Sequence, residues 1–97
     1  MTIPEKIKIG RKTYKVEQDE RRPHPDGTLC GEIDSIKGTI YLYNKLDDDD
    51  KAVTLLHEII HGICFQRGQE ISEGLIDALA EGFFLLFKDN PELKFNE

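Results

Sequence analysis

Two histidines and a glutamate stand close together in the middle of the chain, as His57-Glu58-Ile59-Ile60-His61. Residues four apart on an α-helix lie on the same side, so both imidazoles would point to one place. Two neutral imidazoles at this spacing can bind one zinc ion, while Glu58 can reach a water molecule on that ion without coordinating it. Zinc polarises a carbonyl and acidifies water, and a carboxylate can accept the released proton. The motif therefore predicts peptide-bond hydrolysis with Glu58 as the general base.

The residues around this motif favour a packed helix. The flanking positions are apolar: Leu55, Leu56, Ile59, Ile60 and Ile63. Burying two histidines and a glutamate in such a helix costs free energy unless each has a partner. The alternative is an ordinary amphipathic helix with two partly exposed histidines beside a surface glutamate, because a bare HExxH motif also occurs by chance.

A catalytic zinc ion usually has three protein ligands and one open position, so a third ligand is needed. Three acidic residues follow the motif at four-residue steps and share one face of a second predicted helix: Glu73, Asp77 and Glu81. Each of them could complete the ligand set. Spacing alone leaves the choice open.

The order His57-Glu58-x-x-His61 and then Glu73-x-x-x-Asp77 resembles the gluzincin arrangement of thermolysin-like peptidases. Residues 53–91 are also similar to the short ImmA/IrrE-type and related phage-encoded metallopeptidase domains. The resemblance implies a minimal zincin-like fold, with Glu73 as the third zinc ligand and Asp77 as the acid that hydrogen-bonds the first histidine. A carboxylate in that place would fix the histidine tautomer and raise its basicity. The resemblance further suggests a phage or prophage origin and a protein or peptide substrate.

The chain also departs from these families. Only eleven residues separate His61 from Glu73, which is short for gluzincins, and the ImmA/IrrE pattern more often has Asn at the position of Asp77. A shift of one helical turn would make Asp77 the ligand and Glu81 the residue that orients the histidine. Asp77 and Glu81 therefore remain alternative third ligands.

A peptidase of this type also needs an electrophilic group near the developing oxyanion. The sequence does not choose among four possible donors: His24, Tyr41, Tyr43 and Arg67. In zincin folds an edge strand beside the metal pairs with extended substrate, and by resemblance the strands within residues 33–43 could do this.

The elements that must position these residues divide the chain in two. Residues 1–46 predict strands, since short segments alternate polar and apolar residues on either side of glycine-containing turns. The expected strands are Lys6–Ile9, Thr13–Glu17, Gly31–Ile36 and Thr39–Tyr43, with a polar loop over Gln18–Thr28.

Residues 47–91 predict two helices. The run Asp47–Asp50 suits a helix N-terminus better than a calcium site, because it lacks the glycine and spaced oxygen ligands of an EF-hand loop. We expect the first helix to stop at Arg67-Gly68, and the second to begin at the N-cap Ser72 and end at Asn90-Pro91. The expectation is a single α+β domain over residues 1–97, with a small antiparallel sheet of three or four strands followed by two helices.

Composition limits the functional classes. The chain has 97 residues and a formal net charge of −6, which disfavours general nucleic-acid binding. No stretch approaches the roughly 20 apolar residues that cross a bilayer, and the N-terminus lacks the pattern of a secretory signal. We therefore expect a cytoplasmic protein without a membrane partner, in which Cys30 and Cys64 are free thiols.

Two functions compete for this pattern. The first is a zinc endopeptidase acting on a protein or peptide. The second is a non-catalytic domain in which zinc stabilises a small fold that binds another protein. Glu58 favours the first, because a purely structural zinc site has no use for a general base and usually has a closed, cysteine-rich shell.

Overall fold

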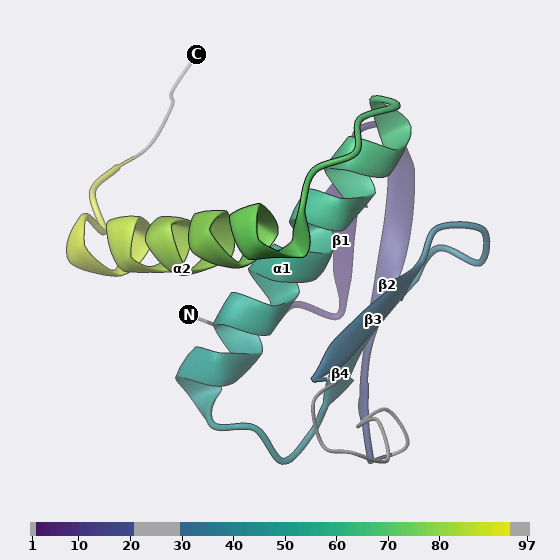
Figure 1. Cartoon of the computed structure of the whole chain (residues 1–97). Coiled ribbons are helices and arrows are strands. Elements are labelled where there is room, and N and C mark those ends of the chain that lie inside the picture. Colours follow the sequence, from purple (N-terminus) through teal and green to yellow (C-terminus); the bar gives the residue numbers. More distant parts are fainter. Residues whose placement is uncertain (1, 21–29, 94–97) are drawn as a thin grey trace.

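The computed structural model describes residues 2–20 and 30–93 of the chain. Four strands come first and two helices follow, as the sequence predicts (Figure 1). The elements in order are β1 (Lys6–Ile9), β2 (Lys12–Asp19), β3 (Gly31–Asp34), β4 (Thr39–Tyr43), α1 (Asp48–Gln66) and α2 (Glu73–Asp89). The predicted α+β class is confirmed.

The sheet has the strand order β1-β2-β4-β3 and is mixed. The two hairpins, β1–β2 and β3–β4, are antiparallel, but β2 pairs in parallel with β4. The expectation of a wholly antiparallel sheet is therefore wrong at this one junction. The connection from β2 to β4 contains β3, and it returns the chain to the same end of the sheet, which makes the central pair parallel.

Two strand ends differ from their predicted positions for local reasons. β2 continues to Asp19, because its last residues pair with β4 as far as Tyr43. β3 ends at Asp34, whose carboxylate accepts hydrogen bonds from the backbone N–H groups of Ile36 at 3.1 Å and Lys37 at 2.9 Å. The predicted loop after β2 lies largely outside the described residues.

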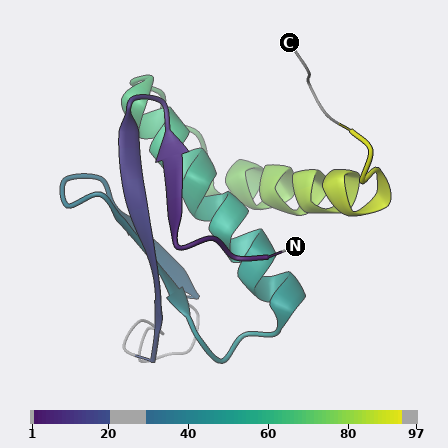
Figure 2. The ribbon, with the colours of Figure 1, turned by 180° about the vertical axis from the view of Figure 1, so that it is seen from behind.

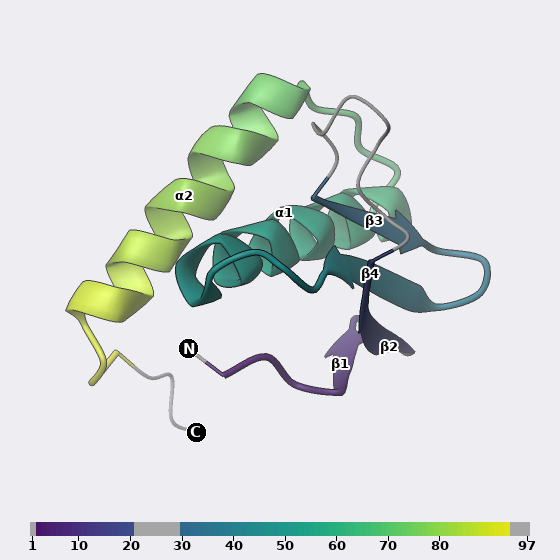
Figure 3. The same ribbon diagram turned by 90° about the horizontal axis from the view of Figure 1, so that it is seen from below.

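The molecule is built in three layers. α1 lies diagonally across one face of the sheet, and α2 crosses the outer side of α1 (Figures 1 and 2). The core between α1 and the sheet contains the buried residues Ile9, Tyr14, Ile40, Leu42 and Leu55. Among the described elements α2 packs against α1 and against no strand, and Figure 3 shows it extending away from the sheet.

Both helices begin where the sequence predicts, and the predicted N-cap Ser72 is confirmed. The Asp47 carboxylate accepts a hydrogen bond from the Asp50 N–H at 2.8 Å, and the next three aspartates form the first turn of α1. The Ser72 hydroxyl accepts one from the Leu75 N–H at 3.2 Å at the start of α2. The aspartate run is thus a helix start. Neither described helix is long and apolar enough to cross a membrane.

Candidate metal centre

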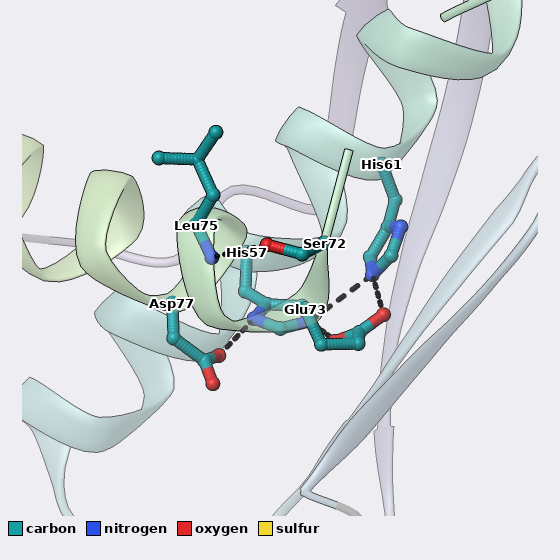
Figure 4. A network of polar contacts seen from close by, with 6 residues as sticks. All are labelled: His57, His61, Ser72, Glu73, Leu75 and Asp77. Carbon is teal, nitrogen blue, oxygen red and sulfur yellow. Dashed lines mark hydrogen bonds and ion pairs between the residues drawn. The ribbon is translucent and has the colours of Figure 1, made fainter. Parts of the chain in front are cut away.

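The residues of the HExxH motif lie on two adjacent faces of helix α1. Ala52, Leu55, Glu58 and Gly62 form the buried side of the helix that is turned to the sheet. His57, which is four residues before His61, lies on the neighbouring side that faces α2 (Figure 4). This split follows from the helical period, since adjacent residues are about 100° apart. It turns the histidines towards one helix and the glutamate towards the sheet.

Three donor groups converge between α1 and α2. The Nε2 atoms of His57 and His61 are 3.1 Å apart. The Glu73 carboxylate bridges them, with one oxygen 3.2 Å from His57 Nε2 and the other 2.9 Å from His61 Nε2. Among the described residues these three form the one group whose donor atoms are close enough together to hold a metal ion. Figure 4 shows Glu73 reaching both rings from the first turn of α2.

Asp77 lies on the far side of the first imidazole. Its carboxylate is 2.8 Å from His57 Nδ1 (Figure 4). A neutral imidazole that donates its Nδ1–H to Asp77 has its lone pair on Nε2, which is the atom that faces His61 and Glu73. The arrangement places Asp77 where a residue that orients a ligand would stand, one helical turn after Glu73.

The donor set fits a tetrahedral cation. With metal–ligand distances of about 2.0–2.2 Å, ligand atoms of a tetrahedral zinc site are roughly 3.3 Å apart. The His57 Nε2–His61 Nε2 separation of 3.1 Å is close to that value, and the Glu73 carboxylate approaches the two rings to 3.2 and 2.9 Å with one oxygen on each. Taking one atom from each residue, the three donors lie within 4.8 Å of one another. With neutral His57 bonded to Asp77, its Nε2 lone pair also faces a Glu73 oxygen, so two acceptors confront each other. A metal cation between them would accept both lone pairs, while the Glu73 side chain, which is 68 % exposed, also remains in contact with solvent.

Glu58 lies next to His57 in the sequence, on the buried side of α1. It is 6 % exposed. With His57, Glu73 and Asp77 it lines a cleft of about 300 Å³ that continues to Gly31 at the start of β3. Burial, together with the negative charges of Glu73 and Glu32, raises the pKa of Glu58 to about 7. A nearby dication would oppose this effect and favour the carboxylate form.

Glu81, the rival carboxylate, lies two turns beyond Glu73 and is exposed. It is not part of the donor group that the described residues form. Asp77 is likewise outside that group, because its oxygen meets the Nδ1 side of His57. The geometry therefore favours Glu73 as the third ligand over either alternative.

The predicted oxyanion donors lie elsewhere. Tyr41 is 8 % exposed within the central strand β4, and Tyr43 is half-buried at the end of that strand. Arg67 caps the C-terminal end of α1. None of these three lines the cleft at Glu58, as far as the described residues define it. His24 lies outside the described residues.

Sequence reasoning missed the part of β3 that closes the cleft. Cys30, just before β3, and Gly31, its first residue, line the cleft together with His57. A Cβ on Gly31 would lie 2.6 Å from Thr54 Cγ2 of α1 and 2.9 Å from the Tyr41 carbonyl oxygen, so the residue must be small for β3 to approach α1. The only sequence signal was a glycine at the start of a strand, where a side chain would normally pack.

Comparison of the chain with protein-family models, with curated proteins and with solved structures finds no match. Any assignment of function therefore depends on the residues and the geometry of the site itself.

Proposed function

We propose that the chain is a zinc-dependent peptidase in which His57, His61 and Glu73 hold the metal and Glu58 is the general base. The observation that carries this proposal is the convergence of the two Nε2 atoms on the Glu73 carboxylate, with separations of 2.9–3.2 Å. Asp77 supports the proposal, because a hydrogen bond from His57 Nδ1 to this carboxylate holds the tautomer that a metal ligand needs.

A bound zinc ion would polarise the scissile carbonyl and lower the pKa of a water molecule. Glu58 then has one task, which is to take a proton from the attacking water and deliver it to the leaving amine. Its position in the cleft beside His57 suits this task. Asp77 keeps the His57 ring fixed throughout.

The edge strand β3 offers a place for extended substrate. The Cys30 carbonyl accepts a hydrogen bond from the Tyr43 N–H at 2.8 Å. In an antiparallel pair the bonding residues alternate, so the backbone groups of Gly31 and Ile33 point away from β4 towards the edge of the sheet, which no other described strand covers. A peptide that pairs with this edge would lie alongside the cleft. We therefore infer a protein or peptide substrate. The two unpaired thiols, Cys30 and Cys64, fit a cytoplasmic setting.

The decisive experiment separates the base from the metal ligands. Glu58→Gln should keep stoichiometric zinc and the fold but lower the hydrolysis of fluorescein-labelled casein by about 10²–10⁴-fold. His57→Ala should lose both zinc and hydrolysis. Glu81→Gln makes the same chemical change as Glu58→Gln, but at an exposed position. It should change neither zinc binding nor hydrolysis. Normal turnover by Glu58→Gln would refute the assignment of the base.

The second candidate is a zinc-stabilised interaction domain without catalysis. It is favoured by the packing of α2, which contacts α1 and no other described element. A metal ion held between the two helices would strengthen this contact. Zinc binding with no turnover of any peptide by the wild-type protein, together with a large loss of stability on metal removal, would select this second function.

A further inference from the structure

A second cavity lies where the β1–β2 turn, the β3–β4 turn and the C-terminal end of α1 meet. Its volume is about 620 Å³. Arg11, Lys12 and Arg67 line it, and no acidic residue does within the described part of the chain. Three cations around one hollow stand out in a chain whose net charge is −6.

The two guanidinium groups are available for a ligand. Arg11 and Arg67 are exposed, and neither forms an ion pair with any described residue. Lys12 is partly committed, since its ammonium donates hydrogen bonds to the backbone carbonyls of Ser35 and Ile36, the latter at 3.1 Å. The arginines can therefore supply forked donors, while Lys12 adds charge.

One effect opposes an anion here. The cavity adjoins the C-terminal end of α1, which carries a partial charge of about −0.5. Three full positive charges outweigh it. The end carbonyls are also already bonded, with Arg67 N–H donating to the Ile63 carbonyl at 3.0 Å and Gln69 N–H to that of Cys64 at 2.9 Å. The charged side chains that line the cavity are thus all positive, although Asp34 lies close enough to Lys12 for their charges to interact.

Tyr14 forms a buried part of the cavity wall. It lines the same cavity and is fully buried. Its hydroxyl is the one buried side-chain polar atom among the described residues that has no hydrogen-bond partner. Buried hydroxyl groups are normally bonded, but this one is closed to solvent, so a ligand could reach it only if the surrounding side chains moved.

We propose that this cavity binds an oxyanion, a carboxylate or phosphate group, through the guanidinium groups of Arg11 and Arg67 with the charge of Lys12. The site does not depend on the proposed peptidase activity. Its ligand could be a small free anion or an acidic group of a polypeptide. A further hollow of about 430 Å³ shares Ser35 and Phe65 with this cavity and is also lined by His61, so a polypeptide at the metal centre could reach it.

The test is a titration of the full, zinc-loaded chain with phosphate and with acetate, followed by amide NMR shifts at constant ionic strength. We expect saturable shifts at Gly10, Arg11 and Arg67. The double variant Arg11→Gln/Arg67→Gln should bind at least tenfold more weakly. Lys45→Gln/Lys88→Gln removes the same net charge from two exposed lysines in surface ion pairs and should bind as the wild type does. Equal affinity in the two double variants, or the same shifts with chloride, would overturn the proposal.

A second arm identifies the source of the oxyanion. N-acetylated hexa-alanine with a free C-terminal carboxylate is compared with its amidated form, in the Glu58→Gln background that should prevent hydrolysis. Shifts at Gly31 and Ile33 as well as in the cavity, seen with the free acid alone, would assign the site to a polypeptide. Shifts with phosphate or acetate only would assign it to a small anion. Failure of all these probes to shift the cavity residues would refute the site, whatever the enzyme assay shows.

Discussion

The Asp77 carboxylate contacts Nδ1 of His57. Asp77 should therefore affect the zinc affinity through His57 and should not itself be a ligand. We expect Asp77→Ala to retain zinc but to lower its affinity by about 10–100-fold, because the imidazole loses its fixed tautomer and some basicity. Competition with a chelating dye measures this. Glu73→Ala should abolish stoichiometric binding, and Glu81→Ala should leave the affinity unchanged. Loss of zinc in Glu81→Ala with retention in Glu73→Ala would place the ligand two turns later.

The raised pKa of Glu58 predicts that the stability of the metal-free protein depends on pH. This pKa is about 7 in the fold and 4.5 in the reference state. The folded state therefore holds the proton longer, so the free energy of unfolding falls as the pH rises from about 4.5 to about 7 and is level above that. The loss is on the order of 3 kcal/mol. Glu58→Gln should remove this slope and be the more stable protein at pH 8, as urea unfolding at pH 4.5 and pH 8 would measure. Parallel profiles for the two proteins would contradict the prediction.

The residues of α1 could be assigned from the sequence because one helix determines where positions 57, 58 and 61 point. Spacing alone could not assign the proposed third ligand, and only the resemblance to gluzincins pointed to Glu73. Glu73, Asp77 and Glu81 share one helix face, and the crossing of α1 and α2 decides which of them meets the histidines. The cationic cavity could not be predicted from the sequence either, because its residues come from two separate segments: Arg11 and Lys12 from one, and Arg67 from the other.

At the scale of elements, the contact between β3 and α1 depends on Gly31. A methyl group there would lie 2.6 Å from Thr54 Cγ2, so the helix or the strand must shift. We expect Gly31→Ala to lower the free energy of unfolding by about 2 kcal/mol. Gly82→Ala is the matched control. No atom lies near its added methyl group, and replacing glycine within α2 should raise stability by about 0.5–1 kcal/mol. Urea midpoints would compare the two variants. An unchanged free energy of unfolding in Gly31→Ala would show that β3 and α1 can accommodate the added methyl group.

Element boundaries were largely predictable, and their pairing was only partly so. Asp47 and Ser72 carry the local cap chemistry that starts each helix, and Gly10 and Gly38 provide the positive φ values of the two hairpin turns, at 60° and 72°. The parallel pairing of β2 with β4 has no local signal. It joins segments more than twenty residues apart, for example Val16 with Ile40.

At the scale of the whole molecule, the metal would tie α2 to the rest of the fold, because α2 contacts α1 alone among the described elements. Free zinc at 100 times its dissociation constant stabilises a protein by about 2.7 kcal/mol. We expect EDTA to lower the Tm by roughly 10–20 °C in calorimetry and to speed amide exchange in α2 much more than in β2 and β4. His57→Ala should show the same Tm with and without zinc. Uniform exchange across both regions would argue against a link through the metal.

The strand order β1-β2-β4-β3 also has a kinetic consequence. Each hairpin brings together residues close in sequence and can form within microseconds, whereas the β2–β4 seam must close a much longer loop. We therefore expect the two hairpins to form first and their docking along the seam to limit the folding rate. Substitutions at Val16 or Ile40, which face each other there, should slow refolding more than substitutions in α2, which would mainly hasten unfolding.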